Sequence, residues 1–552
     1  MNKTRPVPVG IDNFKRVIEE GYCYVDKTDL IEDVLTRGAM VNLFPRPRRF
    51  GKTLTISMLE NYFNIKKKEE NKYLFKGLKI ENANATVRET QGKYPVISLN
   101  LKSVKDTTWE KELYKLKEKM SELYYENIEV SEVLNEAEKS DYNAILLKMA
   151  EETVYQLSLK KLSQYLMRYY KQPVIILIDE YDAPIENGFI NGFYDDVINF
   201  MRNFFGEALK TNDYLKFACM TGILRVSKES IFSGLNNIKI YSILDKQYSE
   251  YFGFLPEEVD MLLEEYIEEN QEINKEEVKK WYDGYSFAGT EIYNPWSILN
   301  CISDNRIQPY WVNTGGTSLL EVMLKNAEGD VKKDLEDLMQ GKTIEINLNE
   351  NIVYSEITGS RDNIFNFMLM CGYLTVEKQE RREENIIGKL RIPNIEVKIA
   401  FRTIVNRWFE QNNARKEIAD FQRAILRNDK ELVGLILNQL MLKSISYFEN
   451  VENFYHGFVL GLLVDMGEKY IVESNRESGY GRYDMKIEKK DGSIGIILEF
   501  KTVKEEEKME EMAEKALEQI DKNEYYLDMK ERGITNILKY GIAFNNKKAV
   551  LK

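Results

Sequence analysis

The fold expected for the first half of the chain is decided by one stretch, residues 39–63, which reads AMVNLFPRPRRFGKTLTISMLENYF. The run AMVNLF (39–44) is short and apolar, as in a buried strand, and LTISMLENYF (54–63) has apolar residues at helical spacing. Between them, RPRRFGKT (46–53) ends like a phosphate-binding loop of the form G-x-x-x-x-G-K-S/T. Strand, loop and helix therefore occur in the order that this motif requires.

The loop keeps the second half of the motif. We expect Lys52 to reach the β- and γ-phosphates of a nucleotide, Thr53 to offer its hydroxyl to Mg²⁺, and Gly51 to allow close approach of the backbone. These three residues are typical of an ATP site.

The first half of the loop departs from the motif. Arg46 stands where the first glycine is expected, and the prolines at 45 and 47 supply no N–H donors. Positive charge from Arg46, Arg48 and Arg49 would compensate for the missing donors. The alternative is a basic turn, stiffened by proline, ahead of an ordinary helix.

A second nucleotide feature is VIILIDEYDAPI (174–185). Its apolar run is of the type buried on both faces of a parallel sheet, and it ends in Asp179 and Glu180. We expect Asp179 to hold Mg²⁺ through water and Glu180 to orient and deprotonate the attacking water. The alternative is a strand whose acidic end faces solvent.

A third feature is CMTGILRVSKESIFSGLNN (219–237). A strand here would place Thr221 near the γ-phosphate, and Arg225 would act as a finger on that phosphate, in cis or from a neighbouring subunit of a homo-oligomer. The alternative is an ordinary surface loop.

The C-terminal part contains a metal-nuclease pattern. GRYDMKI (481–487) places Asp484 on one strand, and GIILEFKTV (495–503) places Glu499 and Lys501 on the next. Glu499 and Lys501 are two positions apart, so their side chains share one face of the strand. An Asp-Gly pair between the two strands predicts a hairpin turn.

The chemistry of these residue types suits phosphodiester cleavage. Asp484 and Glu499 would bind Mg²⁺ or Mn²⁺ through oxygen, and the metal would polarise the phosphate and activate a bound water. Lys501 would orient that water or stabilise the developing charge. Arg482 is a candidate phosphate contact, and Glu473 a candidate additional metal ligand. The alternative is a half-exposed strand with ordinary alternating charge.

Composition limits the chemistry. The chain has 552 residues, is 43% hydrophobic, and carries a net charge of −13. Any nucleic-acid contact must therefore use a local basic surface. A single histidine excludes sites that need several imidazoles, and the 4 cysteines are too far apart to indicate zinc or a disulfide framework. We expect a cytoplasmic protein, without signal peptide or membrane contact, because no apolar run approaches the ~20 residues that span a bilayer.

The order of strand-like and helical segments along the chain predicts its domain organisation. Strand-like and helical runs alternate up to about residue 250, as in a doubly wound α/β domain. A mainly helical middle region follows, with a strand pair near 372–376 and 390–394 and a charged, exposed turn over 378–388. A second α/β texture then predicts strands near 468–473, 482–488, 494–503 and 539–544.

The set RPRRFGKTL, YVDKT (24–28), LIDEYDAPI, WYDGYSF and YNPWSI, with NFYHGFVLGLL near the C-terminus, resembles a bacterial and archaeal family of AAA-ATPase-like proteins. The resemblance covers nearly the whole chain. It implies an AAA-like P-loop ATPase domain over 1–250, a mainly helical middle region over 251–445, and a PD-(D/E)XK nuclease-like, restriction-endonuclease-like α/β domain over 446–552. Gln519 and Tyr525 are similar to an auxiliary motif of some such nucleases.

We therefore expect a protein that binds and hydrolyses ATP with Mg²⁺ and is coupled to a metal-dependent nuclease domain. DNA is the expected substrate rather than RNA, by analogy of fold alone. The alternative is an ATP-controlled binding switch, in which the nuclease-like domain is catalytically silent and only holds a partner.

Overall fold

The computed structural model describes residues 5–225, 237–266, 273–311, 329–339, 341–350, 354, 360–401, 415–444, 455, 458–459, 462–463, 466, 469–478, 481–503, 508–545 and 548–552. The chain forms two compact units. The first unit comprises residues 1–323 and 343–398, and the second comprises residues 324–342 and 399–552.

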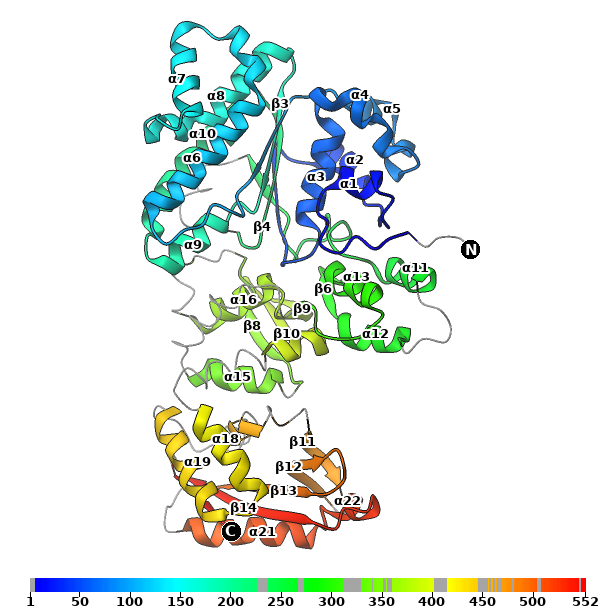
Figure 1. Ribbon diagram of the computed structural model, residues 1–552, viewed down its shortest axis with the longest axis vertical. Coiled ribbons are helices and arrows are strands. Elements are labelled where there is room, and N and C mark those ends of the chain that lie inside the picture. Colours follow the sequence, from blue (N-terminus) through cyan, green and yellow to red (C-terminus); the bar gives the residue numbers. More distant parts are fainter. Residues whose placement is uncertain are drawn as a thin grey trace. The chain divides into compact units, whose positions relative to one another are not determined.

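A five-stranded sheet of order β2-β3-β4-β1-β5 forms the centre of the first unit (Figure 1). All neighbouring strands in it run parallel. The strands are β1 (Val41–Pro45), β2 (Val96–Asn100), β3 (Val174–Asp179), β4 (Leu215–Gly222) and β5 (Ile238–Ile240). The expected parallel α/β sheet is thereby confirmed, while the short edge strand β5 was not predicted.

Helices cover both faces of this sheet (Figure 1). One layer contains α1 (Phe14–Glu19), α2 (Asp29–Arg37), α3 (Lys52–Phe63), α4 (Lys68–Asn71) and α5 (Ala85–Arg88). The other contains α6 (Trp109–Glu126), α7 (Glu136–Leu146), α8 (Glu152–Tyr170), α9 (Ala183–Asn191) and α10 (Tyr194–Leu209). Short 3₁₀ turns lie at Ile65–Lys67, Lys72–Phe75, Lys79–Asn82 and Ile128–Val133.

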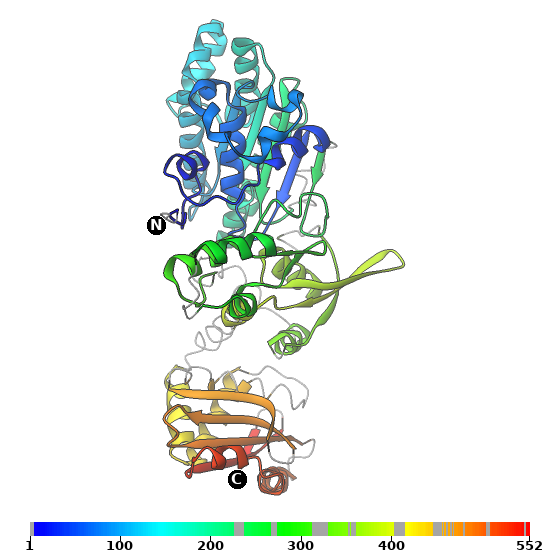
Figure 2. The same ribbon diagram turned by 90° about the vertical axis from the view of Figure 1, so that its right-hand side faces the viewer.

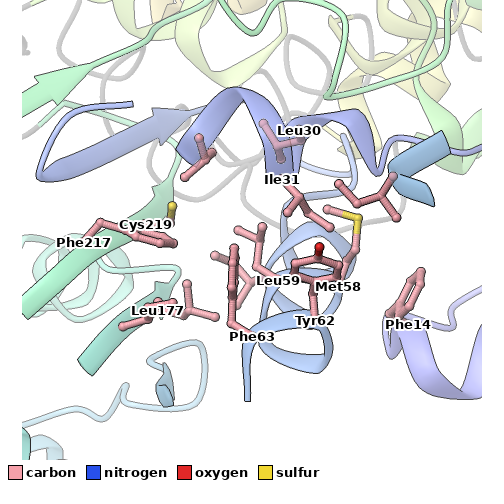
Figure 3. Packing of buried hydrophobic residues seen from close by; sticks show 14 of the residues in the cluster. Phe14, Leu30, Ile31, Met58, Leu59, Tyr62, Phe63, Leu177, Phe217 and Cys219 are labelled. Carbon is pink, nitrogen blue, oxygen red and sulfur yellow. The ribbon is translucent and has the colours of Figure 1, made fainter. Parts of the chain in front are cut away.

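The helix that follows the loop is fixed by packing. Its apolar residues, among them Leu59 and Phe63, face buried Leu177 of β3 and Cys219 of β4, while Phe14 of α1 closes the far side (Figure 3). Burial of side chains of this size stabilises by about 1.5–3 kcal/mol each. The packing of α3 against β3, β4 and α1 therefore fixes the position of its amino-terminal end, where the loop joins the helix.

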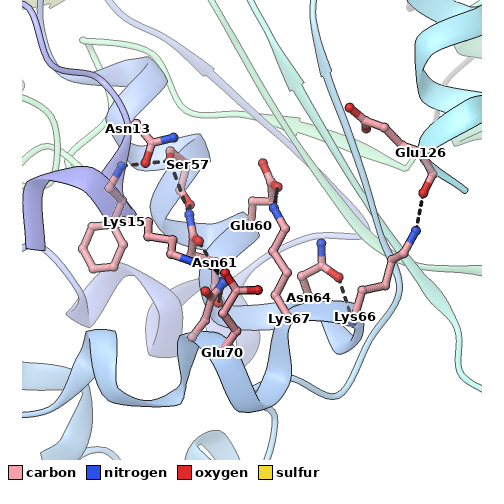
Figure 4. Close-up of polar contacts among 12 residues, drawn as sticks. Asn13, Lys15, Ser57, Glu60, Asn61, Asn64, Lys66, Lys67, Glu70 and Glu126 are labelled. Carbon is pink, nitrogen blue, oxygen red and sulfur yellow. Dashed lines mark hydrogen bonds and ion pairs between the residues drawn. The ribbon is translucent and has the colours of Figure 1, made fainter. Parts of the chain in front are cut away.

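Polar contacts anchor the same helix near its carboxyl end (Figure 4). The Ser57 hydroxyl accepts the backbone N–H of Phe14 at 2.9 Å, and the Asn61 amide donates to the Ser57 carbonyl at 2.8 Å. Asn64, the carboxyl cap of α3, accepts the backbone N–H of Lys66 at 3.0 Å. These bonds join α3 to α1 and to the turn after it.

The rest of the first unit is a smaller mixed region. It contains α11 (Pro256–Tyr266), α12 (Lys275–Tyr282), the hairpin β6 (Tyr285–Phe287) with β7 (Thr290–Ile292), and α13 (Pro295–Asp304). A sheet of order β8-β10-β9 follows, built from β8 (Ile344–Asn347), β9 (Thr375–Arg382) and β10 (Asn385–Arg391), with α16 (Arg361–Cys371) beside it.

The prediction of an exposed turn over 378–388 is wrong. β9 and β10 pair from Thr375 and Arg391 to Arg382 and Asn385, so the turn is confined to the hairpin tip (Figure 2). Charged side chains suggested a loop, but on a hairpin exposed on both faces they point to solvent while the backbone ladder still forms.

The second unit is built on a mixed sheet of order β11-β12-β13-β14-β15. Its strands are β11 (Tyr470–Ser478), β12 (Gly481–Lys489), β13 (Gly495–Thr502), β14 (Ile537–Asn545) and β15 (Lys548–Leu551). β13 and β14 run parallel, and the other neighbours run antiparallel. The expected second α/β region is confirmed, with β15 as an unpredicted edge strand.

Helices cover both faces of this second sheet. α18 (Arg415–Leu426) and α19 (Lys430–Ser444) pack on one face through a buried cluster that includes Leu437, Leu498 and Phe544. α21 (Met509–Lys522) and α22 (Leu527–Glu531) cover the other face, and α15 (Gly329–Met339) also belongs to this unit. Among the helices in the described ranges, none has the length and apolarity to cross a bilayer.

Candidate functional sites

The carboxyl ends of the parallel strands bring the predicted nucleotide residues to one edge. β4 lies between β1 and β3, with Phe44 of β1 aligned with Thr221 of β4. On the other side of β3, Asn100 of β2 is aligned with Asp179. In open parallel sheets this edge is where ligands bind. The loop over residues 46–53 leaves β1 at the same edge.

Asp179 is the centre of this edge, with a side chain only 1% exposed. One carboxylate oxygen accepts the Thr53 hydroxyl at 2.8 Å and the Asn100 amide at 2.7 Å, and the other accepts the Thr221 hydroxyl at 2.5 Å. The structure therefore brings together Thr53, Asp179 and Thr221. Asn100, the last residue of β2, was not predicted.

Lys52 lies at the mouth of the loop. Its ammonium group donates to the carbonyls of Arg46 at 2.9 Å and Pro47 at 2.8 Å. Burial lowers the pKa of Lys52, and the nearby charge of Glu180 opposes that shift. Gly51, the amino cap of α3, has φ 81°, in the left-handed region that favours glycine, and a Cβ there would meet no atom within 4 Å.

Glu180 stands apart from the residues around it. It has φ 50°, unusual for a residue other than glycine, and its side chain is half-buried. Its carboxylate has no hydrogen-bond partner within the described ranges. Burial lowers the pKa of both Lys52 and Arg49, and the charge of Glu180 opposes both shifts. The Glu180 carboxylate is therefore electrostatically coupled to the loop.

Arg46 differs from the prediction. Its side chain is 0% exposed and its guanidinium donates to the carbonyls of Tyr241 at 2.5 Å and Tyr248 at 3.1 Å. The same group lies over the rings of Phe252 and Phe287. Arg46 thus ties the loop to the chain after β5, and its charge is held by the fold rather than offered to a phosphate.

The other loop arginines also have protein partners. Arg48 forms an ion pair with Glu186 of α9 at 3.0 Å, and Lys105 reaches the same carboxylate at 3.3 Å. The Arg49 guanidinium lies 4.1 Å from the centre of the Trp296 ring. The basic loop therefore contacts α9 and α13 within the first unit.

Arg225 follows β4, and residues 226–236 beyond it lie outside the described ranges. One of its guanidinium nitrogens lies 3.9 Å from the carboxylate of Glu350, which also accepts the Ser242 hydroxyl. A role as a finger on phosphate requires Arg225 to leave Glu350.

The predicted nuclease residues lie on β12 and β13 of the second unit. Asp484 accepts the backbone N–H of Phe500 at 2.7 Å, which joins its carboxylate to the adjacent strand. Lys501 donates to Glu499 at 3.1 Å, as expected for two residues on one face of a strand. The three candidate residues therefore converge.

Glu499 is the most unusual member. It is 2% exposed, and its Oε1 accepts bonds from Lys501 and from Gln519. Its Oε2 is buried and has no hydrogen-bond partner within the described part of the chain. Burial, and then the charge of Asp484, raises the pKa of Glu499 to about 7.

The supporting residues divide into two groups. Gln519 donates to Glu499 at 2.5 Å and to the Tyr525 hydroxyl at 3.1 Å, which brings this pair to the carboxylates. Glu473 instead accepts the Tyr483 hydroxyl at 3.2 Å and lies 3.5 Å from the Lys486 ammonium. The side chain of Arg482 lies outside the described part of the structure.

The donor sets fit magnesium at both places. At the first site, the Thr53 hydroxyl and Asp179 carboxylate supply hard oxygen atoms. At the second, Asp484 and Glu499 supply carboxylates. The Oε2 of Glu499, for which the described part of the chain provides no partner, offers a buried lone pair that a cation would satisfy. Magnesium keeps several waters when it binds proteins, so one or two carboxylates suffice.

The fold and these sites define the class of protein. It is an α/β protein with a phosphate-loop motif at the edge of a parallel sheet and with paired carboxylates on a second, mixed sheet. A family model described as predicted AAA-ATPase matches residues 8–232, and a model of the PD-(D/E)XK nuclease superfamily matches residues 450–552. The N-terminal region is therefore similar to AAA-ATPase-like domains, and the C-terminal region is similar to domains of the PD-(D/E)XK nuclease superfamily.

A curated protein is similar over much of the length. This is an uncharacterized protein in the vnfD 5′ region of Azotobacter chroococcum mcd 1, 26% identical over 399 residues. The similarity covers 71% of this chain and 68% of that protein.

Proposed function

We propose that this chain binds and hydrolyses ATP at the carboxyl edge of its parallel sheet, and that the nucleotide state governs a magnesium-dependent nuclease site acting on nucleic acid. DNA is the expected substrate. The observation that carries the ATPase proposal is the convergence of Thr53 and Thr221 on the buried Asp179 carboxylate. Hydroxyl and carboxylate oxygens at the end of a parallel strand, beside a phosphate-loop lysine, are what ATP with Mg²⁺ requires.

Each residue of the first site then has a role. Lys52 and the backbone at Gly51 would hold the β- and γ-phosphates, and Thr53 with Asp179 would hold the ion. Bound magnesium would neutralise charge on the phosphates. Glu180 would take the proton of the attacking water, and Thr221 would lie beside the γ-phosphate.

At the second site, Asp484 and Glu499 would hold a metal that polarises the scissile phosphate and activates water. Lys501, which now bonds Glu499, would turn to the phosphate or to the water as the carboxylate engages the cation. The buried Oε2 of Glu499, which has no hydrogen-bond partner among the described residues, carries this half of the proposal.

The binding switch is the second candidate, and one observation favours it. The Glu499 Oε1 is already engaged by Lys501 and Gln519, and burial raises the pKa of Glu499 to about 7, which favours a neutral carboxyl over a metal ligand. A domain in that state would keep its fold and hold a partner without cleaving it.

The decisive test incubates purified protein with supercoiled plasmid, linear duplex, single-stranded DNA and RNA, with and without Mg²⁺ and ATP. The proposal expects metal-dependent cleavage that responds to ATP and is lost in Asp484→Ala. Retention of nucleic acid that responds to ATP, without any cleavage, would establish the binding switch instead. If the protein neither cleaves nor retains nucleic acid, both candidate functions are overturned.

A further inference from the structure

A buried carboxylate next to the proposed ATPase residues has no role in the scheme above. Asp182 lies three positions after Asp179 and is 4% exposed. Its Oδ2 accepts two successive backbone N–H groups, from Ile223 at 2.8 Å and Leu224 at 3.0 Å. These residues lie between Gly222, the last residue of β4, and Arg225.

Tyr181, the residue before Asp182, also bonds to the segment over residues 221–224. The Tyr181 hydroxyl donates to the carbonyl of Leu224 at 2.5 Å, and its backbone N–H donates to the carbonyl of Thr221 at 3.0 Å. Between these contacts the two segments approach closely at Gly222. A Cβ on Gly222 would lie 2.6 Å from the Tyr181 ring and 2.7 Å from Asp182 Oδ1.

Glu180 is the exception in this stretch. Asp179, Tyr181 and Asp182 all bond to the end of β4 or to the residues after it, whereas the Glu180 side chain leaves the chain at a backbone with φ 50°. Such a conformation costs about 1–3 kcal/mol and persists where the surroundings enforce it. The bonds on either side of Glu180 enforce it here.

We infer that Asp182 is a positioning residue for ATP hydrolysis, which holds Glu180 in register with Thr221 and Arg225. The inference rests on the proposed ATPase function and extends it. Carboxylate bonds to backbone N–H groups are charge-assisted and therefore stronger and more directional than neutral ones. Without the Asp182 carboxylate, the residues after β4 are no longer bonded to the segment that carries Glu180. A shift of about 1 Å in the position of Glu180 is enough to slow catalysis by about 10²-fold.

The test measures kcat and KM for ATP in Asp182→Ala and Asp182→Asn. We expect Asp182→Ala to lower kcat by roughly 10- to 100-fold with KM within about threefold, because the Asp182 carboxylate bonds the backbone N–H groups of residues 223 and 224 and is proposed to act through Glu180. The amide oxygen of Asp182→Asn can accept both N–H groups, so this variant should recover most of kcat. Glu138→Gln is the control and should keep kcat within twofold, because this carboxylate also accepts a backbone N–H, from Asn135, but otherwise pairs with Arg168 of α8.

A double-mutant cycle distinguishes a positioning role of Asp182 from a purely structural one. If Asp182 acts through Glu180, then adding Asp182→Ala to Glu180→Gln should cost little more than Glu180→Gln alone. Additive losses, or an unchanged kcat in Asp182→Ala, would overturn the inference. Thermal melting is measured for every variant to show that it folds. If Asp182→Ala does not fold, Gly222→Ala replaces it in the cycle, because the added Cβ disturbs the contact of residue 222 with Tyr181 and Asp182.

The two proposals fail in different ways. Wild-type protein that binds ATP but does not hydrolyse it overturns the proposed ATPase, and this inference with it. Wild-type turnover that Asp182→Ala leaves intact overturns the positioning role alone.

Discussion

Two buried carboxylates, Asp179 of the parallel sheet and Glu499 of the mixed sheet, are almost equally shielded from water, at 1% and 2% exposed. Their partners differ. Asp179 accepts bonds from three neutral side chains on three different elements, so both of its oxygens are satisfied. Glu499 has one oxygen engaged and one, Oε2, without a partner among the described residues.

The two sites therefore differ in how far protein groups already satisfy the carboxylate before a cation binds. The first site is organised by its own hydroxyl and amide groups, and an ion there would share the Thr53 oxygen with Asp179. The second site buries a carboxylate that its protein partners satisfy only in part, and such burial is costly unless a cation or proton compensates. We therefore expect the first site to respond to nucleotide and the second to respond to metal by itself.

The largest effect should come from the second site. Asp484→Ala and Glu499→Ala should each reduce metal-dependent cleavage to background, because both are proposed to hold one ion. The double variant should add little, since residues that act as a unit are not additive. Gel assays of plasmid cleavage measure this.

The matched control for that prediction is Glu473→Gln. Glu473 bonds Tyr483 and lies beside Lys486, so its loss should leave cleavage within a few-fold of wild type. Substantial cleavage by Asp484→Ala would remove the paired-carboxylate site, and loss of cleavage in Glu473→Gln would add a ligand to it.

The next effect tests the first site. Glu180→Gln keeps the shape of the side chain but removes the base, so ATP should still bind while turnover falls by roughly 10²–10⁴-fold. ATPase and cleavage rates are measured in parallel. Cleavage that persists or rises indicates that bound ATP assembles the nuclease, and cleavage that falls with turnover indicates that hydrolysis drives it. An unchanged ATPase rate would exclude Glu180 from the mechanism.

A smaller effect distinguishes the residues of the atypical loop. Lys52→Ala should weaken ATP binding by roughly 10- to 100-fold, the worth of charge-assisted hydrogen bonds at about 1.5–3 kcal/mol, with the fold intact. Arg49→Ala should change affinity by less than about threefold, because its guanidinium lies on Trp296. Calorimetry on both variants decides, and equal losses would mean that Arg49 leaves Trp296 for the phosphates.

Sequence reasoning succeeded where the signal is local and failed where distant residues decide. The strand, loop and helix around Lys52 follow from short-range spacing, and Asp179 follows from an apolar strand with an acidic end. The contacts of Arg46 could not be predicted, because its partners, the backbone carbonyls of Tyr241 and Tyr248, lie 195 and 202 positions further along the chain and are common to every residue type.

The same reasoning applies to the elements and to Glu499. The edge strands β5 and β15 are too short to show a periodic pattern, and the charged hairpin of β9 and β10 lacks the apolar alternation that marks a half-buried strand. Residue types placed Glu499 beside Asp484 and Lys501. They could not show that one of its oxygens lacks a partner, because that depends on how α21 packs over β13.

The smallest effect concerns stability and follows from that unpartnered oxygen. The pKa of Glu499 is raised to about 7, above the ordinary value near 4.5, so folding favours the protonated carboxyl. Without metal, the contribution of Glu499 to stability should be greatest below about pH 4.5 and should be lost as pH rises through about 7. Glu499→Gln removes this decline and should be more stable than wild type at pH 8 by about 1–3 kcal/mol.

Magnesium then separates a metal site from mere burial. At pH 8, Mg²⁺ at 100 times its Kd should stabilise wild type by about 2.7 kcal/mol and leave Glu499→Gln almost unchanged. Glu396 is the matched control, because burial also raises its pKa to about 7, but its oxygens accept the Ser297 hydroxyl and the backbone N–H groups of residues 310 and 311. Glu396→Gln should therefore lose part of the pH dependence while keeping the full response to Mg²⁺. If Mg²⁺ stabilises Glu499→Gln as strongly as wild type, the unpartnered oxygen marks a buried acid and not a ligand.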